Sequence, residues 1–117
     1  MSRNAQFAKP GLALTVAVFY VLLSLSIKER HGYEILKYVE ASSEGRVRLG
    51  PGTLYTTLKR MLDAGLISEP IDRPENDDPR RRYYKLSPRG RAELGAELSR
   101  MQHALKLAGK RRVRAST

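Results

Sequence analysis

The feature that most constrains the fold of this 117-residue chain is the stretch from Leu49 to Leu66, LGPGTLYTTLKRMLDAGL. Pro51 suits the first turn of a helix, where its missing N–H would have had no partner, and Gly65 suits the position after the last turn. Between Pro51 and Gly65, four apolar residues recur on one side at helical spacing: Leu54, Leu58, Met61 and Leu62. The stretch therefore predicts a helix that packs one face against a core.

The opposite face of this helix is polar and cationic. It carries Thr53, Thr56, Lys59, Arg60 and Asp63. Such a face offers hydrogen-bonding groups and positive charge with little bulk, as a helix in a DNA major groove does. An ordinary solvated helix face has the same composition, so this segment alone leaves both interpretations open.

An uncharged run, GLALTVAVFYVLLSLSI, extends from Gly11 to Ile27. A signal peptide would need a small-residue cleavage site, and the residues that follow offer no convincing one. A transmembrane helix needs about 20 mainly apolar residues, and this run is at the short limit and contains Thr15, Tyr20, Ser24 and Ser26. We favour a helix buried in the centre of a small domain, or shared between two subunits, because the rest of the chain needs a packing partner. Residues 1–10 are expected to form a flexible arm.

A helix-turn-helix is predicted from residue 32 onwards. Residues 28–32, KERHG, have the composition of a turn. The next helix is expected from Gly32 to about Ser42, with Ile35, Leu36 and Val39 as its apolar stripe. A connection over residues 42–52 leads to the helix that begins at Pro51. Two short helices joined in this way, the second with a polar outer face, form a helix-turn-helix pattern.

After Gly65 the hydrophobic period changes from that of a helix to that of strands. Residues 66–70 indicate a short strand, residues 72–79 a polar loop, and residues 80–87, RRRYYKLS, a basic strand. In the basic strand Tyr84 and Leu86 share one face, and Tyr83 and Lys85 share the other. The order of three helices and two strands predicts a mainly α fold with a small β-hairpin (α+β), a winged helix-turn-helix over residues 11–87.

A last helix is predicted from its cap, Ser87, and from Pro88 at its first position. Leu94, Leu98, Met101, Leu105 and Ala108 alternate spacings of four and three residues, the period of a two-stranded coiled coil. We expect residues 88–109 to form a dimerisation helix that also packs on the first helix, with Leu14 and Val18 at the interface. The alternative is an amphipathic helix folded on its own domain. Residues 110–117 are a basic tail.

The formal net charge of +10 attracts polyanions, either nucleic acid or an anionic membrane surface. The charge is unevenly spread: residues 69–78 hold five acids and one base, whereas residues 80–91 hold six bases and no acid. Lysine and arginine at the base of a wing meet phosphates. We therefore expect Arg80, Arg81 and Arg82 to contact phosphate or a groove.

Signals for enzyme chemistry are weak. The chain has no cysteine, which excludes disulfides and thiolate ligands and fits a cytoplasmic protein. It has no phosphate-binding loop motif and no histidine pair at metal-ligand spacing. His31 fits a turn residue that bonds locally. We expect no catalytic activity, no metal and no cofactor.

Three motifs in order, HGYEI (residues 31–35), PGTLYTTLKRMLDAGLI (51–67) and RRRYYKLSPRGR (80–91), together resemble the PadR family of bacterial transcriptional regulators. The resemblance covers about residues 11–91. It implies a winged helix-turn-helix with a C-terminal dimerisation helix. It also implies a homodimeric repressor that binds double-stranded DNA at a near-palindromic operator and releases it when a small aromatic or drug-like effector binds.

The resemblance also implies DNA contacts. GTLY supplies Gly52, Thr53 and Tyr55 at the start of the recognition helix, HGYEI supplies Tyr33, and the basic strand supplies Arg81, Arg82, Tyr83 and Tyr84. The full expected DNA-binding set is Tyr33, Gly52, Thr53, Tyr55, Thr56, Lys59, Arg60, Arg80, Arg81, Arg82 and Tyr84. The chain lacks tryptophan, so an effector pocket must use Phe7, Phe19, Tyr20, Met101 and aliphatic side chains.

Two other functions are compatible with the residues. One is a small membrane-associated basic protein anchored through residues 11–27. The other is a winged-helix module that binds protein rather than DNA, because a fold alone does not determine function.

Overall fold

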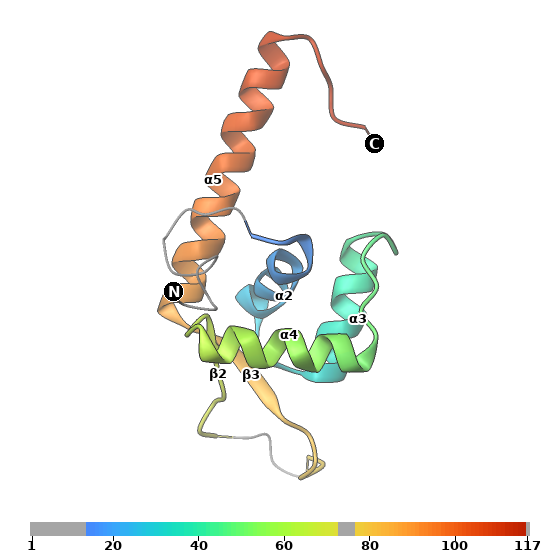
Figure 1. Ribbon diagram of the computed structural model, residues 1–117, viewed down its shortest axis with the longest axis vertical. Helices are drawn as coiled ribbons and strands as arrows, with labels where there is room; N and C mark the ends of the chain where they lie inside the picture. The colour runs from blue at the N-terminus through green and yellow to red at the C-terminus, as the bar shows by residue number, and fades with distance from the viewer. Residues whose placement is uncertain (1–13, 73–76, 117) are drawn as a thin grey trace.

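The computed structural model describes residues 14–72 and 77–116. In these residues it contains four helices and three short strands (Figure 1). In chain order they are α2 (Val16–Ile27), β1 (Arg30–His31), α3 (Gly32–Ser42), α4 (Pro51–Asp63), β2 (Ile67–Ser68), β3 (Tyr83–Leu86) and α5 (Pro88–Lys110). The mainly helical winged-helix fold predicted from the sequence is confirmed.

Helix α2 is the central, buried helix. The Thr15 side chain caps it by accepting a hydrogen bond from the backbone N–H of Val18, and the side chains of Val21 and Leu22 are fully buried. The helix begins at Val16 rather than Gly11, since Leu14 and Thr15 lie outside it and residues 11–13 lie outside the described residues. None of the helices within residues 14–72 and 77–116 has the length and apolar character to cross a bilayer.

Helices α3 and α4 form the predicted helix-turn-helix. Helix α3 starts with a capping box, in which His31 accepts from the Glu34 backbone and the Glu34 carboxylate accepts from the His31 backbone. Helix α4 starts at Pro51 and is followed by Gly65 at φ +77°. The apolar stripe of α4, Leu54, Leu58 and Met61, is at most 1% exposed, with Leu62 packed at its edge.

The sheet has three antiparallel strands in the order β1-β3-β2, where the sequence predicts two. The predicted turn at residues 28–32 is wrong at Arg30 and His31, which pair with Tyr84 and Tyr83. The Arg30 side chain holds this segment: its Nε donates to the Ser24 carbonyl at 2.9 Å, and its guanidinium lies over the Tyr38 ring. A two-residue strand has no hydrophobic period, so pattern alone does not reveal it.

The hairpin predicted as the wing is present, with shorter strands. Ile67 pairs with Leu86 and Ser68 with Lys85, while residues 80–82 precede β3 rather than belonging to it. The predicted alternation is confirmed, because Tyr84 is buried and Lys85 is exposed. Arg80, Arg81 and Arg82, called the three wing arginines below, therefore lie on the loop that leads into β3.

Helix α5 begins where predicted, and its first residues are hydrogen-bonded to the segment that follows α4. Ser87 accepts from the Gly90 N–H at 3.0 Å and donates to the Gly65 carbonyl at 2.6 Å. Gly90 packs so closely that a Cβ there would lie 2.0 Å from the Leu66 carbonyl oxygen. Leu94 joins the core, and beyond it α5 projects away from the domain (Figure 1).

The close approach at Gly90 generates a stability prediction. Gly90→Ala is expected to lower the free energy of unfolding by about 1–3 kcal/mol, because backbone must move to admit the methyl group. Gly95→Ala is the matched control on the same helix: nothing lies within 4 Å of its Cβ position, so it should raise stability by about 0.5–1 kcal/mol. Urea unfolding followed by circular dichroism measures both. Equal effects of the two substitutions would refute the tight contact.

Candidate nucleic-acid interface

The outward face of α4 is the one predicted from the sequence. Because its apolar stripe is buried, the opposite residues Gly52, Thr53, Thr56, Lys59 and Arg60 are exposed. The Thr56 hydroxyl donates to the Gly52 carbonyl at 3.0 Å. Its proton is therefore used within the helix, and the hydroxyl presents lone pairs to an outside partner.

A hollow of about 220 Å³ lies beside this face, where four separate segments meet. It is lined by His31, Gly32, Tyr33, Tyr55, Arg80, Arg81 and Arg82. These residues come from β1, the start of α3, the exposed side of α4 and the loop before β3. The structure thus brings Tyr33, Tyr55 and the three wing arginines together, as a shared binding surface requires.

A second hollow of about 300 Å³ lies between α4 and the wing. Its lining is Tyr55, Lys59, Leu62, Asp63, Arg82 and Tyr84. Tyr55 and Arg82 border both hollows, so the two form one continuous surface next to the α4 face. Tyr84 is only 1% exposed, so its contribution to that surface is small.

Two residues that position this surface were missed as site residues in the sequence. Gly32 lies against the Tyr55 side chain, and a Cβ at Gly32 would be 2.8 Å from the Tyr55 hydroxyl oxygen. His31 bonds locally, as expected, by capping α3, and it also packs edge-on against the Tyr83 ring, with 5.3 Å between ring centroids. Both residues occur in HGYEI, but the contacts span distant parts of the chain, and no local pattern reports them.

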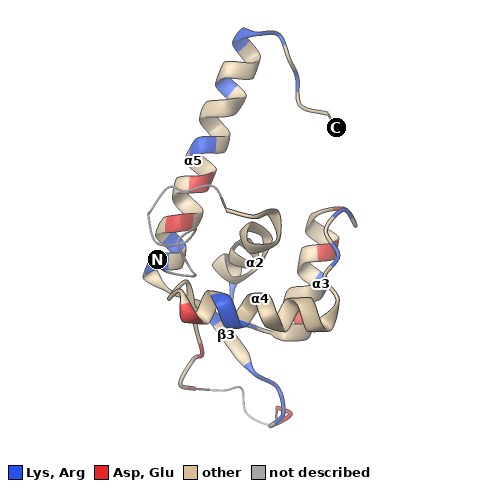
Figure 2. Ribbon diagram, in the orientation of Figure 1, with Lys and Arg blue, Asp and Glu red and all other residues tan. Residues whose placement is uncertain are grey.

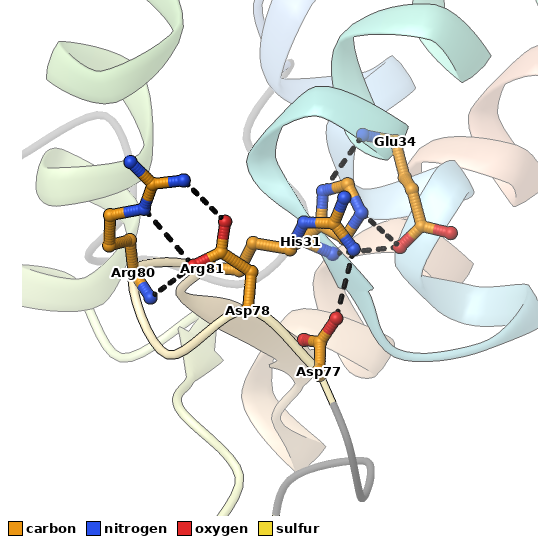
Figure 3. Close-up of polar contacts among 6 residues, drawn as sticks. All are labelled: His31, Glu34, Asp77, Asp78, Arg80 and Arg81. Atoms are coloured by element: carbon orange, nitrogen blue, oxygen red, sulfur yellow. Dashed lines mark hydrogen bonds and ion pairs between the residues drawn. The ribbon is translucent and has the colours of Figure 1, made fainter.

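Arg80 and Arg81 are each paired with a carboxylate of the wing loop (Figure 3), and Arg82 is paired with Glu69. Arg80 binds Asp78 through two side-chain nitrogens, at 3.0 and 3.1 Å. Arg81 binds Asp77 at 2.9 Å, and Arg82 binds Glu69 at 2.9 Å. The basic cluster predicted from the sequence is therefore locally neutralised by the acids of the same wing.

The pairing shifts the pKa values of the groups involved. The hydrogen bond from Tyr83, helped by Arg81, lowers the pKa of the Asp77 carboxyl. The hydrogen bond from Arg82 lowers the pKa of Glu69, and each carboxylate raises the pKa of its arginine. Asp77 and Glu69 are therefore ionised at neutral pH, and the pairs are between full charges.

Charge elsewhere is segregated along α5. The charged residues in the upper part of this helix and in the tail are all Lys or Arg, whereas the acidic residues of the helix lie in its lower part (Figure 2). This distal basic segment comprises Arg100, Lys106, Lys110, Arg111, Arg112 and Arg114. It lies far along α5 from the α4 face, so part of the +10 charge is remote from the surface described above (Figure 1).

The residues expected at a dimer interface divide into two groups. Val18 and Leu94 are 5% exposed and lie in the core of their own protomer, and Leu14 packs against that core. Leu98 and Met101 are each 39% exposed and Leu105 is 59% exposed, with Ala108 half-buried further along. The seam of α5 beyond Leu94 is therefore an exposed apolar face in the described part of the chain.

The residues expected in an effector pocket come from more than one element: Phe19 and Tyr20 lie on α2, and Met101 lies on α5. A hollow of about 530 Å³ is lined by Tyr20 together with Ser42, Ser43, Glu44, Arg46 and Ser116. Phe19 packs against the core and Met101 lies on α5, while Phe7 lies outside the described residues. No cluster of three or more metal-ligating side chains occurs in residues 14–72 and 77–116.

A helix-turn-helix with an exposed polar second helix, followed by an antiparallel hairpin, defines a winged-helix domain. The family model described as "Transcriptional regulator PadR-like family" matches residues 21–96, which is more than half of the chain. The chain therefore belongs to the PadR-like family of transcriptional regulators, whose members are regulators rather than enzymes.

Solved structures share this fold. A PadR family transcription regulator from Clostridium difficile R20291 matches with a TM-score of 0.68 and 26% identity, over 82% of this chain and 97% of that one. The circadian clock associated protein Pex from Anabaena matches with 0.56 and 27%, over 92% and 99%. Bacillus subtilis PadR, solved in complex with operator DNA, matches in fold with 0.62 and 24%, over 72% and 47%. A comparison with curated protein sequences gave no match.

Proposed function

We propose that this chain is a sequence-specific DNA-binding transcriptional regulator that acts as a homodimeric repressor in the cytoplasm. The observation that carries the proposal is the meeting of Tyr33, Tyr55 and the wing arginines in one hollow beside the exposed α4 face. A duplex presents base edges and phosphates at the same time, and this arrangement offers side chains for both.

In the proposed complex α4 lies in the major groove. Thr53, Thr56, Lys59 and Arg60 read or border bases, and Gly52 lets the start of the helix approach the duplex, since it adds no side chain there. Tyr33, Arg80, Arg81 and Arg82 hold phosphates at the hollow, which Tyr55 also lines. Tyr84 supports Arg82 from the core side.

The dimer is proposed to form through α5. Leu98, Met101 and Leu105 form its exposed apolar seam, which pairing with a second copy would bury. Two recognition helices related by a two-fold axis would meet half-sites about 10 base pairs apart, or a multiple of that spacing. The operator is therefore expected to be near-palindromic.

Regulation is proposed to act through the same interface. A small aromatic or drug-like ligand bound against Tyr20, Met101 and neighbouring aliphatic groups would favour one arrangement of the two protomers and release the operator. The support is the apolar seam of α5, which contains Met101 and joins the core at Leu94, the core against which Tyr20 also packs.

Selection from a randomised duplex pool tests the function. The protein is expected to enrich a two-fold symmetric sequence and to retain it in a gel shift against excess unrelated duplex, because base contacts survive where charge attraction is competed away. Binding that competitor abolishes and physiological salt removes would reduce the interaction to attraction by the +10 charge. The proposal would then be overturned.

Arg60 is the sharpest single test of the α4 face. Arg60→Ala should weaken binding to the selected duplex by about 1–3 kcal/mol and relax preference at one base position, because arginine reads a base edge there. Lys106→Ala removes the same charge from α5 and should leave the preference unchanged. Fluorescence anisotropy and footprinting measure both variants. An Arg60→Ala protein with wild-type affinity and footprint would remove Arg60 from the interface.

Leu105 tests the dimer. Leu105→Glu should convert a wild-type dimer into a folded monomer, because the side chain is 59% exposed in the protomer and the new charge lies on the seam. Leu107→Glu is the matched control, since Leu107 is 48% exposed on the same helix but off the seam. Sedimentation velocity gives the mass of each. A monomeric wild type, or a dimeric Leu105→Glu protein, would contradict the proposed interface.

A further inference from the structure

The three wing arginines lie at the proposed phosphate-binding surface, and each already holds an anion from its own chain. The pairs differ in how deeply they are set. The Asp77 side chain is 10% exposed and also accepts a hydrogen bond from Tyr83, so Asp77–Arg81 belongs to the internal structure of the wing. In Asp78–Arg80 and Glu69–Arg82 both partners are more open: 32% and 89% exposed in the first, 47% and 60% in the second. We call these two the exchange pairs.

The geometry of Asp78–Arg80 places the carboxylate where a phosphate would bind. Nε and Nη2 of Arg80 both donate to Asp78, at 3.1 and 3.0 Å. This two-nitrogen edge is the one that guanidinium groups use for bidentate phosphate contacts. Arg80 therefore cannot give that edge to a phosphate while the pair is closed. Figure 3 shows this pair on one side of the wing, with Arg81 extending toward the start of α3.

We propose that Asp78 and Glu69 compete in cis with DNA phosphates for Arg80 and Arg82, so that the wing engages DNA by exchanging a carboxylate for a phosphate. The inference rests on the proposed function, because it concerns how the same surface binds a duplex. The binding free energy that each of these two arginines contributes is then only the difference between its contact with a phosphate and its contact with a carboxylate. Asp78 and Glu69 thereby lower the affinity for DNA, and its salt dependence, below what Arg80 and Arg82 alone would give.

Asp78→Asn separates the charge from the fold of the wing. The Asp78 side-chain oxygen also accepts the Arg80 backbone N–H at 2.9 Å, and the Asp78 carbonyl accepts from the Arg81 N–H at 3.0 Å. Asparagine keeps an oxygen for the first bond and the same backbone for the second. The turn is therefore retained, while the anion that holds the guanidinium is lost. Glu69→Gln is the second variant and should act in the same direction through Arg82.

The decisive measurement is a double-mutant cycle between Asp78→Asn and Arg80→Gln on two probes. One probe is the duplex that the wild-type protein selects from a randomised pool, and the other is a mixed-sequence duplex of the same length. With arginine at 80, Asp78→Asn is expected to raise the affinity for DNA about fivefold at physiological ionic strength. The slope of log K against log salt should also steepen by about 0.9, the value for one additional phosphate contact. With glutamine at 80, the same change should give less than about a twofold gain, because only screened repulsion is removed.

Glu44→Gln is the control for net charge. Glu44 is exposed and follows the C-terminal end of α3, about 16 Å along that helix from the hollow at its start. The Glu44→Gln substitution removes one negative charge, as Asp78→Asn does, without opening a wing pair. Its effect on affinity should remain below about twofold.

Four results would overturn the inference. A fall in affinity on Asp78→Asn would mean that Asp78 positions Arg80 for phosphate. An equal gain with glutamine at 80, or from Glu44→Gln, would reduce the effect to net charge. No binding to either duplex by any variant would remove the inference together with the proposed function. A separate outcome concerns the proposed function alone. If the pool yields no preferred sequence, sequence-specific binding is refuted, and the mutant cycle on the mixed-sequence duplex still tests the exchange of carboxylate for phosphate.

Discussion

The burial of α2 is the constraint on which the rest of the structure depends. Its side chains at Val21 and Leu22 are fully enclosed, and α3, α5 and β3 all pack against it. The stripe of α4 enters the same core, which sets the rotation of α4 about its own axis. Thr56 and Arg60 face outward because Leu54, Leu58 and Met61 face inward. The surface offered to DNA is in this sense determined by the packing behind it.

The elements that could be predicted from the sequence are those with local signals. Pro51 and Gly65 bracket α4, and Ser87 and Pro88 start α5, because a cap or a left-handed residue acts within a few positions of the chain. The alternation of Tyr84 and Lys85 likewise survives, since a strand with one buried face has a period of two. Residues that share one helix face could be grouped correctly without knowledge of the rest of the fold.

Contacts between distant segments could not be predicted in this way. The pairing of β1 with β3 joins Arg30 to Tyr84, and the approach of Gly32 to Tyr55 joins two helices. The pairing of Glu69 with Arg82 crosses the hairpin, thirteen positions apart. The acids and arginines of the wing are visible in the sequence as separate charge runs. Asp78–Arg80 and Asp77–Arg81 join residues only two and four positions apart, whereas Glu69–Arg82 forms only once the hairpin has folded. The sequence thus predicts which residues belong to the candidate site, but only the fold shows how they form one surface.

Weak wing contacts have a different consequence in a dimer than in a single domain. If each protomer gains little from its arginines, one half-site alone holds the protein poorly. In the proposed dimer α5 links two such domains, so binding of the second becomes intramolecular, and its contribution is set by effective concentration rather than by free protein. That contribution is available only where a second half-site lies at the spacing that the dimer imposes. Carboxylates that lower the affinity of each wing would therefore make occupancy depend on the presence of both half-sites, and reduce the time spent on DNA that offers only one.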